Sequence, residues 1–206
     1  MDDAAAREKL ADALEAERDI SERVVDAIRA VPRHAFVPEE HENQAYRDQP
    51  LPIGNDQTVS APHIVAVMCD RLNLEAGEDV LEIGTGCGYH AAVMAELVGA
   101  DHVFSVEYDP ELAADARENL ADAGYSEVAV REGDGREGWS EHAPYDAAYL
   151  TCAAPEFPAA VVEQLRVGGR LLGPLDDGVQ RLVFAHRTED GLEREHGAAV
   201  RFVRMR

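Results

Sequence analysis

Three glycines alternate at positions 84, 86 and 88, directly after a short run of apolar residues. Residues 79–89 read DVLEIGTGCGY, and residues 91–97 continue with the composition of a helix. A strand, a glycine-rich turn and a helix in this order form a nucleoside-cofactor site in doubly wound α/β proteins. Glycine permits the tight backbone and lets a ligand approach where a Cβ would stand. We therefore expect this loop to bind a cofactor through Gly84, Thr85, Gly86 and Cys87.

The spacing of the glycines limits which cofactor the loop can hold. A dinucleotide fingerprint reads G-x-G-x-x-G and uses its last glycine to pack helix on strand, whereas Tyr89 stands at that position here. Glu82 adds negative charge where a pyrophosphate would be repelled and a positively charged cofactor favoured, so it is expected to belong to the cofactor site. The pattern favours S-adenosylmethionine, which has a sulfonium and no phosphate, over a nicotinamide dinucleotide. An ordinary strand-to-helix turn is the alternative explanation of the glycines alone.

Two further acidic residues follow places where strands of such a sheet should end. Glu107 closes an apolar run about 20 residues after the glycine loop, so its carboxylate is expected to accept the ribose hydroxyls. Asp134 and Gly135 follow the next strand and are expected to contact the adenine. Because Asp-Gly is a common turn sequence, turn chemistry would explain Asp134 if it stood alone.

From residue 79 onward, apolar strand-like runs alternate with helix-like segments. The expected strands are residues 79–83, 102–107, 127–131, 145–151, 169–174, 180–186 and 199–204, and the expected helices are residues 88–99, 110–123 and 157–166. This alternation predicts an α/β fold, a doubly wound and mostly parallel Rossmann-like sheet with helices on both faces. The last two strands have a short polar connection, residues 188–196, and are expected to form an antiparallel C-terminal edge.

The N-terminal part shows a different pattern. Residues 4–17 and 20–31 carry apolar side chains at helical spacing, and Pro32 ends the second helix because its ring removes an N–H donor. Residues 31–55 are irregular and rich in proline. We expect residues 1–60 to form a helical and loop extension over one face of the sheet. Residues 79–206 should form the cofactor-binding core of the same single domain, residues 1–206.

The chain of 206 residues carries 19 basic and 41 acidic residues, a formal net charge of −22. Such a surface repels nucleic acids and anionic membranes, and no apolar run approaches the ~20 residues of a membrane-spanning helix. The acidic residues are spread along the chain, which favours a solvated, halophilic surface whose repulsion concentrated salt would screen. We expect no nucleic acid and no membrane among the partners.

Cysteine and histidine give no disulfide or metal signature. Cys69, Cys87 and Cys152 are odd in number and lack C-x-x-C spacing, and the histidines are scattered, so no metal site is expected. Reduced cysteines, together with an acidic start (Met1-Asp2-Asp3) that lacks an apolar signal segment, predict a cytoplasmic protein.

Four sequence blocks, in the right order, resemble the protein-L-isoaspartate O-methyltransferases. Residues 133–146 read GDGREGWSEHAPYD and are similar to the signature of that family, in which G-D-G is followed at fixed spacing by a glycine, an aromatic residue and A-P-Y-D. Residues 31–38 (VPRHAFVP), 57–63 (QTVSAPH) and 164–171 (QLRVGGRL) also look like family segments. Asn55-Asp56 departs from the family, whose members often carry an aromatic residue and a glycine there.

The resemblance implies a methyltransferase that uses S-adenosylmethionine to methylate the free α-carboxylate of L-isoaspartyl residues in damaged proteins, leaving S-adenosylhomocysteine. The methyl ester then closes to a succinimide, whose hydrolysis partly restores aspartate. The resemblance assigns the active-site role to Ser60, which the sequence alone would equally explain as a helix N-cap. It places Thr58, Val59 and Gln180 at the substrate and His63 beside the cofactor. A free α-carboxylate, with a pKa of about 3.5, needs no general base.

Other functions fit parts of the sequence. A methyltransferase of the same fold could act on a small molecule or on RNA, although the acidic charge disfavours RNA. A non-catalytic, cofactor-binding scaffold is a further interpretation, which the intact set of Gly84, Glu107, Asp134 and Ser60 disfavours. We expect a monomeric protein-repair methyltransferase.

Overall fold

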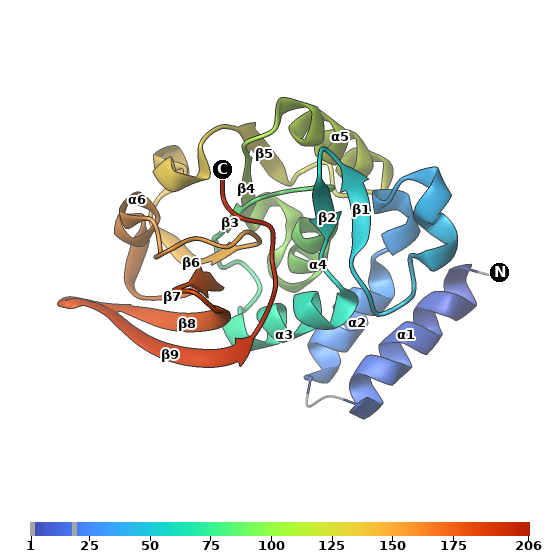
Figure 1. Ribbon diagram of the computed structural model, residues 1–206, viewed down its shortest axis with the longest axis horizontal. Helices are drawn as coiled ribbons and strands as arrows, with labels where there is room; N and C mark the ends of the chain where they lie inside the picture. The colour runs from blue at the N-terminus through green and yellow to red at the C-terminus, as the bar shows by residue number, and fades with distance from the viewer. Residues whose placement is uncertain (1–2, 18–19) are drawn as a thin grey trace.

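The computed structural model describes residues 3–17 and 20–206 and contains a seven-stranded sheet (Figure 1). The strands lie in the order β5-β4-β3-β6-β7-β8-β9. Their bounds are β3 (Val80–Ile83), β4 (Val103–Glu107), β5 (Ala129–Glu132), β6 (Tyr145–Leu150), β7 (Leu165–Asp176), β8 (Gln180–Thr188) and β9 (Gly191–Ala199). β3 to β7 pair in parallel, and β8 pairs antiparallel with both β7 and β9. The doubly wound, mostly parallel sheet with an antiparallel edge is therefore confirmed.

Four helices connect the strands, and capping residues and prolines in the sequence mark where some of them begin. They are α3 (Pro62–Leu72), α4 (Tyr89–Val98), α5 (Pro110–Asp122) and α6 (Ala159–Glu163). Asp109 caps α5 by accepting the N–H groups of Glu111 and Leu112, and Pro110 occupies the first turn, where a missing N–H costs nothing. α6 is shorter than the expected helix over residues 157–166 because β7 already begins at Leu165.

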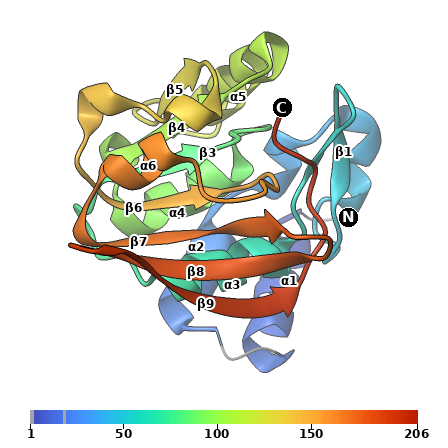
Figure 2. The same cartoon turned by 60° about the vertical axis from the view of Figure 1, so that its left-hand side comes forward.

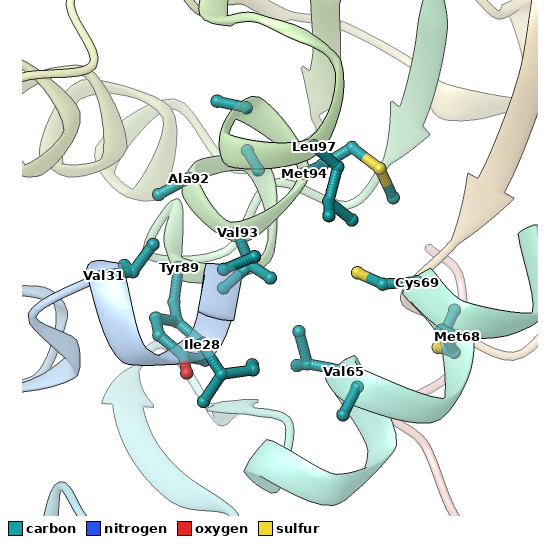
Figure 3. Packing of buried hydrophobic residues seen from close by; sticks show 14 of the residues in the cluster. Ile28, Val31, Val65, Met68, Cys69, Tyr89, Ala92, Val93, Met94 and Leu97 are labelled. Atoms are coloured by element: carbon teal, nitrogen blue, oxygen red, sulfur yellow. The ribbon is translucent and has the colours of Figure 1, made fainter. Parts of the chain in front are cut away.

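Alternate residues of the strands enter two apolar layers. In β3, Val80 belongs to the layer shared with α2, α3 and α4, whereas Leu81 and Ile83 belong to the layer that contains α6. Figure 3 shows the first layer, where Ile28 of α2, Val65 of α3 and neighbouring side chains of α4 point toward a common interior. This packing fixes α3 against α4, and the loops that precede these two helices form the candidate site.

The N-terminal segment packs on helices rather than on the strands. α1 (Asp3–Glu17) lies against α2 (Glu22–Ala30), which in turn lies against α3 and α4 (Figures 1 and 2). Two 3₁₀ turns, η1 (Arg33–Phe36) and η2 (Glu39–Gln44), continue the chain. Both expected helices are present, but α3 and α4 separate them from the sheet face that they were expected to cover.

A two-stranded hairpin follows, where the sequence indicated an irregular segment. It consists of β1 (Leu51–Gly54) and β2 (Gln57–Val59), joined by Asn55-Asp56. Both turn residues have positive φ, 49° and 57°, as in type I′ hairpin turns, and Asn and Asp adopt this conformation more readily than most residues. Strands of three or four residues, one of which contains Pro52, are too short to produce an alternation signal.

The C-terminal edge differs from its prediction in position. β8 turns into β9 at residues 189–190, so the expected connection, residues 188–196, is mostly strand. Most of residues 199–204, expected as a strand, lie beyond the sheet. The strand β9 was missed because nearly all of its residues are exposed, so it lacks the apolar alternation of a half-buried strand. The segment 200–206 runs beside the β1–β2 hairpin (Figures 1 and 2), where Arg206 donates to the Asn55 carbonyl at 2.9 Å.

Three further findings concern only residues 3–17 and 20–206. No helix there is long and apolar enough to cross a membrane. No group of three or more His, Cys, Asp or Glu side chains there could hold a metal ion, and the three cysteines are free. Met1 and Asp2, which contributed to the expectation about the acidic start, lie outside the described residues.

Candidate active site

A cleft that is open to solvent lies at the carboxyl ends of β3 and β4. The glycine loop and the end of β4 form one wall, and the β1–β2 hairpin and residues 203–206 form the opposite wall. Clefts beyond the carboxyl ends of parallel strands are the usual ligand sites of doubly wound sheets.

Most of the predicted site residues line this cleft. They are Thr58, Val59, Ser60, Gly84, Thr85, Gly86, Cys87, Glu107 and Gly135. Segments that are far apart in the sequence thus meet at one place: the hairpin, the glycine loop, the end of β4 and the turn after β5. Glu82, His63, Asp134 and Gln180 are not part of the cleft wall.

The glycine loop has a conformation and surroundings that require glycine. Gly84 has a φ of 98°, and a Cβ built there would collide with Thr151 Oγ1. Thr151 Oγ1 donates to the Gly84 carbonyl at 2.5 Å and so holds the loop against the end of β6. Gly86 has a φ of 55°, and a Cβ there would lie 3.2 Å from Ile53 Cδ1 of the hairpin. The absent side chains leave the backbone of the loop close to the cleft.

Glu107 ends β4 and faces the cleft, with a residual exposure of 8%. Its Oε2 accepts the N–H of Gly86 at 2.9 Å, and its Oε1 accepts the N–H of Asp109 at 3.0 Å. A carboxylate can accept about four hydrogen bonds, so each oxygen retains capacity for a ligand hydroxyl. This geometry suits the predicted ribose contact.

Glu82 points into the protein rather than into the cleft. Its side chain is fully buried, and Oε2 accepts the hydroxyl of Ser105 at 2.5 Å. Ser105 Oγ lies 2.6 Å from Thr85 Oγ1, so a chain of hydroxyls connects Glu82 to the glycine loop. Burial raises the pKa of Glu82 to about 8, against the opposing effect of the Ser105 hydrogen bond. A carboxyl with this pKa is mostly neutral at pH 7, and through Ser105 it supports Thr85. The predicted contact of Glu82 with the cofactor stays a prediction.

His63 and Asp134 have partners outside the cleft. The His63 ring nitrogen Nδ1 lies 2.8 Å from Asp48 Oδ1, which also accepts the His63 backbone N–H. Asp134 Oδ1 accepts the backbone N–H of Arg136, and Oδ2 forms an ion pair with the Arg136 guanidinium at 2.6 Å. This hydrogen-bonded guanidinium lowers the pKa of Asp134. Asp134 therefore shapes the turn that brings Gly135 to the cleft.

Ser60 lies between β2 and α3 and lines the cleft. The residue at the N-cap of α3 is Ala61, and Asp48 Oδ1 accepts the backbone N–H of His63 in the first turn, so the interpretation of Ser60 as a helix cap is wrong. Within the described parts of the chain the Ser60 hydroxyl has no hydrogen-bond partner. Its carbonyl accepts the Arg33 guanidinium at 3.1 Å. The hydroxyl thus stands in the cleft wall without an intramolecular partner.

The sequence did not indicate the C-terminal wall of the cleft. Residues 203–206 line it, and Gln180 holds the segment that leads to them. Gln180 Nε2 donates to the Phe202 carbonyl at 3.2 Å, and its Oε1 accepts the Phe202 N–H at 2.6 Å. Gln180 therefore acts on the cleft through this segment. Other lining residues that were not predicted include Ile53, Tyr108, Asp109, Leu112, Thr151 and Cys152. Each adjoins a predicted element, and this proximity in the sequence is the only signal that could have indicated them.

The residues present fit S-adenosylmethionine. A side chain at Gly84 or Gly86 would press against Thr151 or Ile53 of the cleft wall, so the loop meets the cleft with bare backbone. The Glu107 carboxylate, hydrogen-bonded to Gly86, can accept ribose hydroxyls. Gly135 packs directly against Ile83 of the cleft wall, where a Cβ would collide, so the turn reaches the cleft with bare backbone. Fold and cleft together define a Rossmann-like, S-adenosylmethionine-dependent methyltransferase.

Comparison with known proteins identifies the family within this class. The model of the protein-L-isoaspartate(D-aspartate) O-methyltransferase (PCMT) family matches residues 5–206, and the chain belongs to this family. A protein-L-isoaspartate O-methyltransferase 2 of Archaeoglobus fulgidus is 51% identical over 208 residues, which cover 100% of this chain and 95% of the relative. The enzyme of Methanothrix thermoacetophila is 54% identical over 172 residues, 83% of this chain and 82% of its own length.

Solved structures agree with the fold. A protein-L-isoaspartate O-methyltransferase with 30% identity superposes with a TM-score of 0.90; the match covers 96% of this chain but only 65% of that longer chain. A second structure, a protein from Plasmodium falciparum described as a putative member of the same family, has 23% identity and a TM-score of 0.86 over 97% of this chain and 98% of its own. At this identity the second likeness supports the fold alone.

Proposed function

We propose that this protein repairs damaged proteins by methylating the free α-carboxylate of L-isoaspartyl residues, and that Ser60 orients that carboxylate in the cleft. The observation that carries the proposal is the Ser60 hydroxyl, which lines the same cleft as the glycine loop and Glu107 and has no hydrogen-bond partner in residues 3–17 and 20–206. A hydroxyl in this position can donate to a carboxylate oxygen.

The main requirement of the methyl transfer is that the protein aligns the two reactants. The substrate carboxylate is already ionised at neutral pH, so no side chain has to remove a proton. When bound, S-adenosylmethionine supplies a methyl group activated by the sulfonium. Ser60 fixes one oxygen of the carboxylate, while the glycine loop and Glu107 fix the nucleoside. Because the two reactants are already aligned when bound, the entropic part of the activation barrier is lower. The hairpin and residues 203–206 form part of the cleft wall, and partial desolvation of the carboxylate between them would raise its reactivity.

The remaining site residues have separate proposed roles. Gly84, Thr85, Gly86, Cys87 and Gly135 offer backbone and small side chains to the cofactor. Thr58 and Val59 end the hairpin strand next to Ser60 and would contact the peptide on either side of the damaged residue. Gln180 contributes to substrate binding through the C-terminal segment, in agreement with its bonds to Phe202.

The partners and location follow from charge and composition. With a net charge of −22, the protein is proposed to act as a monomer in the cytoplasm on isoaspartyl proteins, without nucleic-acid or membrane partners. The whole chain, residues 1–206, is proposed to form one domain. The acidic surface is consistent with activity in concentrated salt, where the mutual repulsion of its carboxylates is screened.

A paired peptide assay tests the proposal. The protein is incubated with methyl-labelled S-adenosylmethionine and two peptides that differ only in an aspartyl or isoaspartyl linkage. Base-labile label on the isoaspartyl peptide alone is expected, whereas label transferred to RNA or a small molecule instead would support the alternative function.

A serine pair tests the assigned role of Ser60. Ser60→Ala should lose most of the turnover and keep its affinity for S-adenosylhomocysteine, because the hydroxyl contacts the substrate and not the nucleoside. Ser126→Ala, at an exposed position, is the matched control and should retain wild-type turnover. Wild-type turnover in Ser60→Ala would remove this residue from the mechanism.

A further inference from the structure

Arg33 is a buried cation directly behind the cleft wall. Its side chain is 0% exposed, and it lies in η1, the turn that follows α2. Burial lowers the pKa of Arg33, while the surrounding groups, Tyr89 first among them, act in the opposite direction. Burying a cation is costly unless its donors are satisfied, so the contacts of this guanidinium indicate what the buried charge holds in place.

The guanidinium joins three backbone segments that are separate in the sequence. It donates to the carbonyl of Ala45, and its Nη2 donates to the carbonyls of Gln49 and Ser60, both at 3.1 Å. These carbonyls belong to the end of η2, the approach to β1 and the connection between β2 and α3. A planar fork with several donors can serve such divergent acceptors at once, whereas a lysine ammonium is a single point.

The same guanidinium also contacts the cofactor side of the cleft. Its central carbon lies 5.3 Å from the ring centroid of Tyr89, within the range of a cation–π interaction. Tyr89 is buried, lines the cleft and is the first residue of α4, directly after the glycine loop. Arg33 therefore lies between the serine of the substrate side and the helix of the cofactor side.

We propose that Arg33 is a positioning residue for methyl transfer, which sets the place of Ser60 relative to the glycine loop. The proposal rests on the role proposed above for Ser60. The Ser60 hydroxyl has no partner among the described residues, so its position depends on its backbone, and the Arg33 bond holds the carbonyl of that backbone. Because the substrate oxygen, the methyl carbon and the sulfur must be in line, a small displacement of Ser60 lowers turnover more than it lowers cofactor affinity.

Arg23 offers a matched control within the same helical region. Its guanidinium donates to two backbone carbonyls, those of Leu74 and Leu97, as that of Arg33 donates to three, although Arg23 is exposed. It belongs to α2 and lies away from the cleft, next to residues of α3 and α4. Arg23→Lys should therefore lower the unfolding temperature and leave turnover of the folded protein unchanged.

The experiment compares Arg33→Lys with Arg23→Lys in the full chain. It measures kcat and KM with an isoaspartyl peptide, the Kd of S-adenosylhomocysteine by calorimetry, and the unfolding temperature. In Arg33→Lys we expect kcat to fall about tenfold or more while the Kd stays at the wild-type value. An unchanged kcat would overturn the proposal. A joint fall of kcat and cofactor affinity would also overturn it, because it would indicate that the substitution disturbs the packing of the whole site.

Two further variants keep the result decisive. If Arg33→Lys does not fold, Tyr89→Leu removes the ring under the guanidinium; a lower kcat with unchanged Kd supports the proposal, and wild-type kcat overturns it. The role of Ser60 fails separately, when Ser60→Ala keeps wild-type kcat. The role of Arg33 fails when Ser60→Ala is impaired and Arg33→Lys is not.

Discussion

The carboxylate of Glu107 accepts the backbone N–H of Gly86, with 2.9 Å between Oε2 and the nitrogen. The residue proposed to recognise the ribose thus also holds the loop proposed to cradle the nucleoside. A substitution at Glu107 should therefore affect the cofactor twice, once through the lost ribose contact and once through the loop.

Glu107→Gln tests this double role. The glutamine amide can accept only through one atom, so its NH₂ group would face either the Gly86 N–H or the Asp109 N–H, and two donors would oppose each other. We expect S-adenosylmethionine to bind more weakly by about 1–3 kcal/mol, measured by calorimetry. Glu132→Gln is the matched control, because Glu132 pairs with Glu107 across β4 and β5 but is exposed and outside the cleft. Equal affinity in both variants would contradict the ribose assignment.

The elements that the sequence predicted well are those whose signal is local. The strand, glycine loop and helix around Gly84 follow one another directly, and Glu107 ends the next strand, so chain order alone brings them to one edge of the sheet. The orientation of the Glu82 side chain could not be predicted from the neighbouring residues in the sequence. Whether a strand residue faces the cleft or the interior depends on the layers packed on each face, and here Glu82 lies under the loop with Ser105.

The opposite wall of the cleft could not be predicted, because distant contacts create it. Arg206 meets Asn55 from 151 positions away in the chain. The hairpin that carries Asn55 has strands of three or four residues, and residues 200–206 have no regular pairing pattern beyond an isolated bridge at Arg204. The family resemblance placed Ser60 in the site, but only the packing of this wall showed that Ser60 does not cap α3.

The tip of the hairpin is tied to α5 across the mouth of the cleft. Asn55 Nδ2 donates to Asp109 Oδ1 at 3.1 Å and to Glu111 Oε2 at 3.2 Å. Asp109 and Leu112 of this region line the cleft near Glu107. The Asn55 amide therefore connects the substrate side of the cleft to the helix that follows the ribose-binding strand.

Asn55→Gly should release this connection without breaking the turn. Glycine adopts positive φ readily, and the bond from Arg206 to the carbonyl of residue 55 does not need the side chain. We expect S-adenosylhomocysteine to dissociate about fivefold faster, which corresponds to about 1 kcal/mol for the lost hydrogen bonds. Stopped-flow displacement measures the rate. Asp56→Gly introduces the same glycine flexibility at the neighbouring position, and comparable acceleration in both variants would attribute the effect to flexibility alone.

Glu82 makes the stability of the folded protein depend on pH. Burial raises its pKa from 4.5 to about 8, so between these values the folded state keeps a proton that the unfolded state has released. Because the folded state then binds more protons, the free energy of unfolding falls as the pH rises, by up to about 1.4 kcal/mol per pH unit for one such group. The loss begins above the unfolded pKa and ends near the folded pKa.

Glu82→Gln removes this titration, so the stability of the variant relative to the wild type should change with pH. The glutamine can still accept the Ser105 hydroxyl and carries no charge at any pH, so relative to the wild type the variant should gain stability steadily between about pH 5 and pH 8 and no further above it. Urea unfolding at half-unit intervals measures the two curves. Glu127→Gln, at an exposed position in the turn before β5, shows the effect of removing a carboxylate outside the core. If the free energies of unfolding of wild type and Glu82→Gln changed with pH in parallel, Glu82 would be ionised in the folded protein. A buried negative charge beneath Thr85 would then contribute to sulfonium binding.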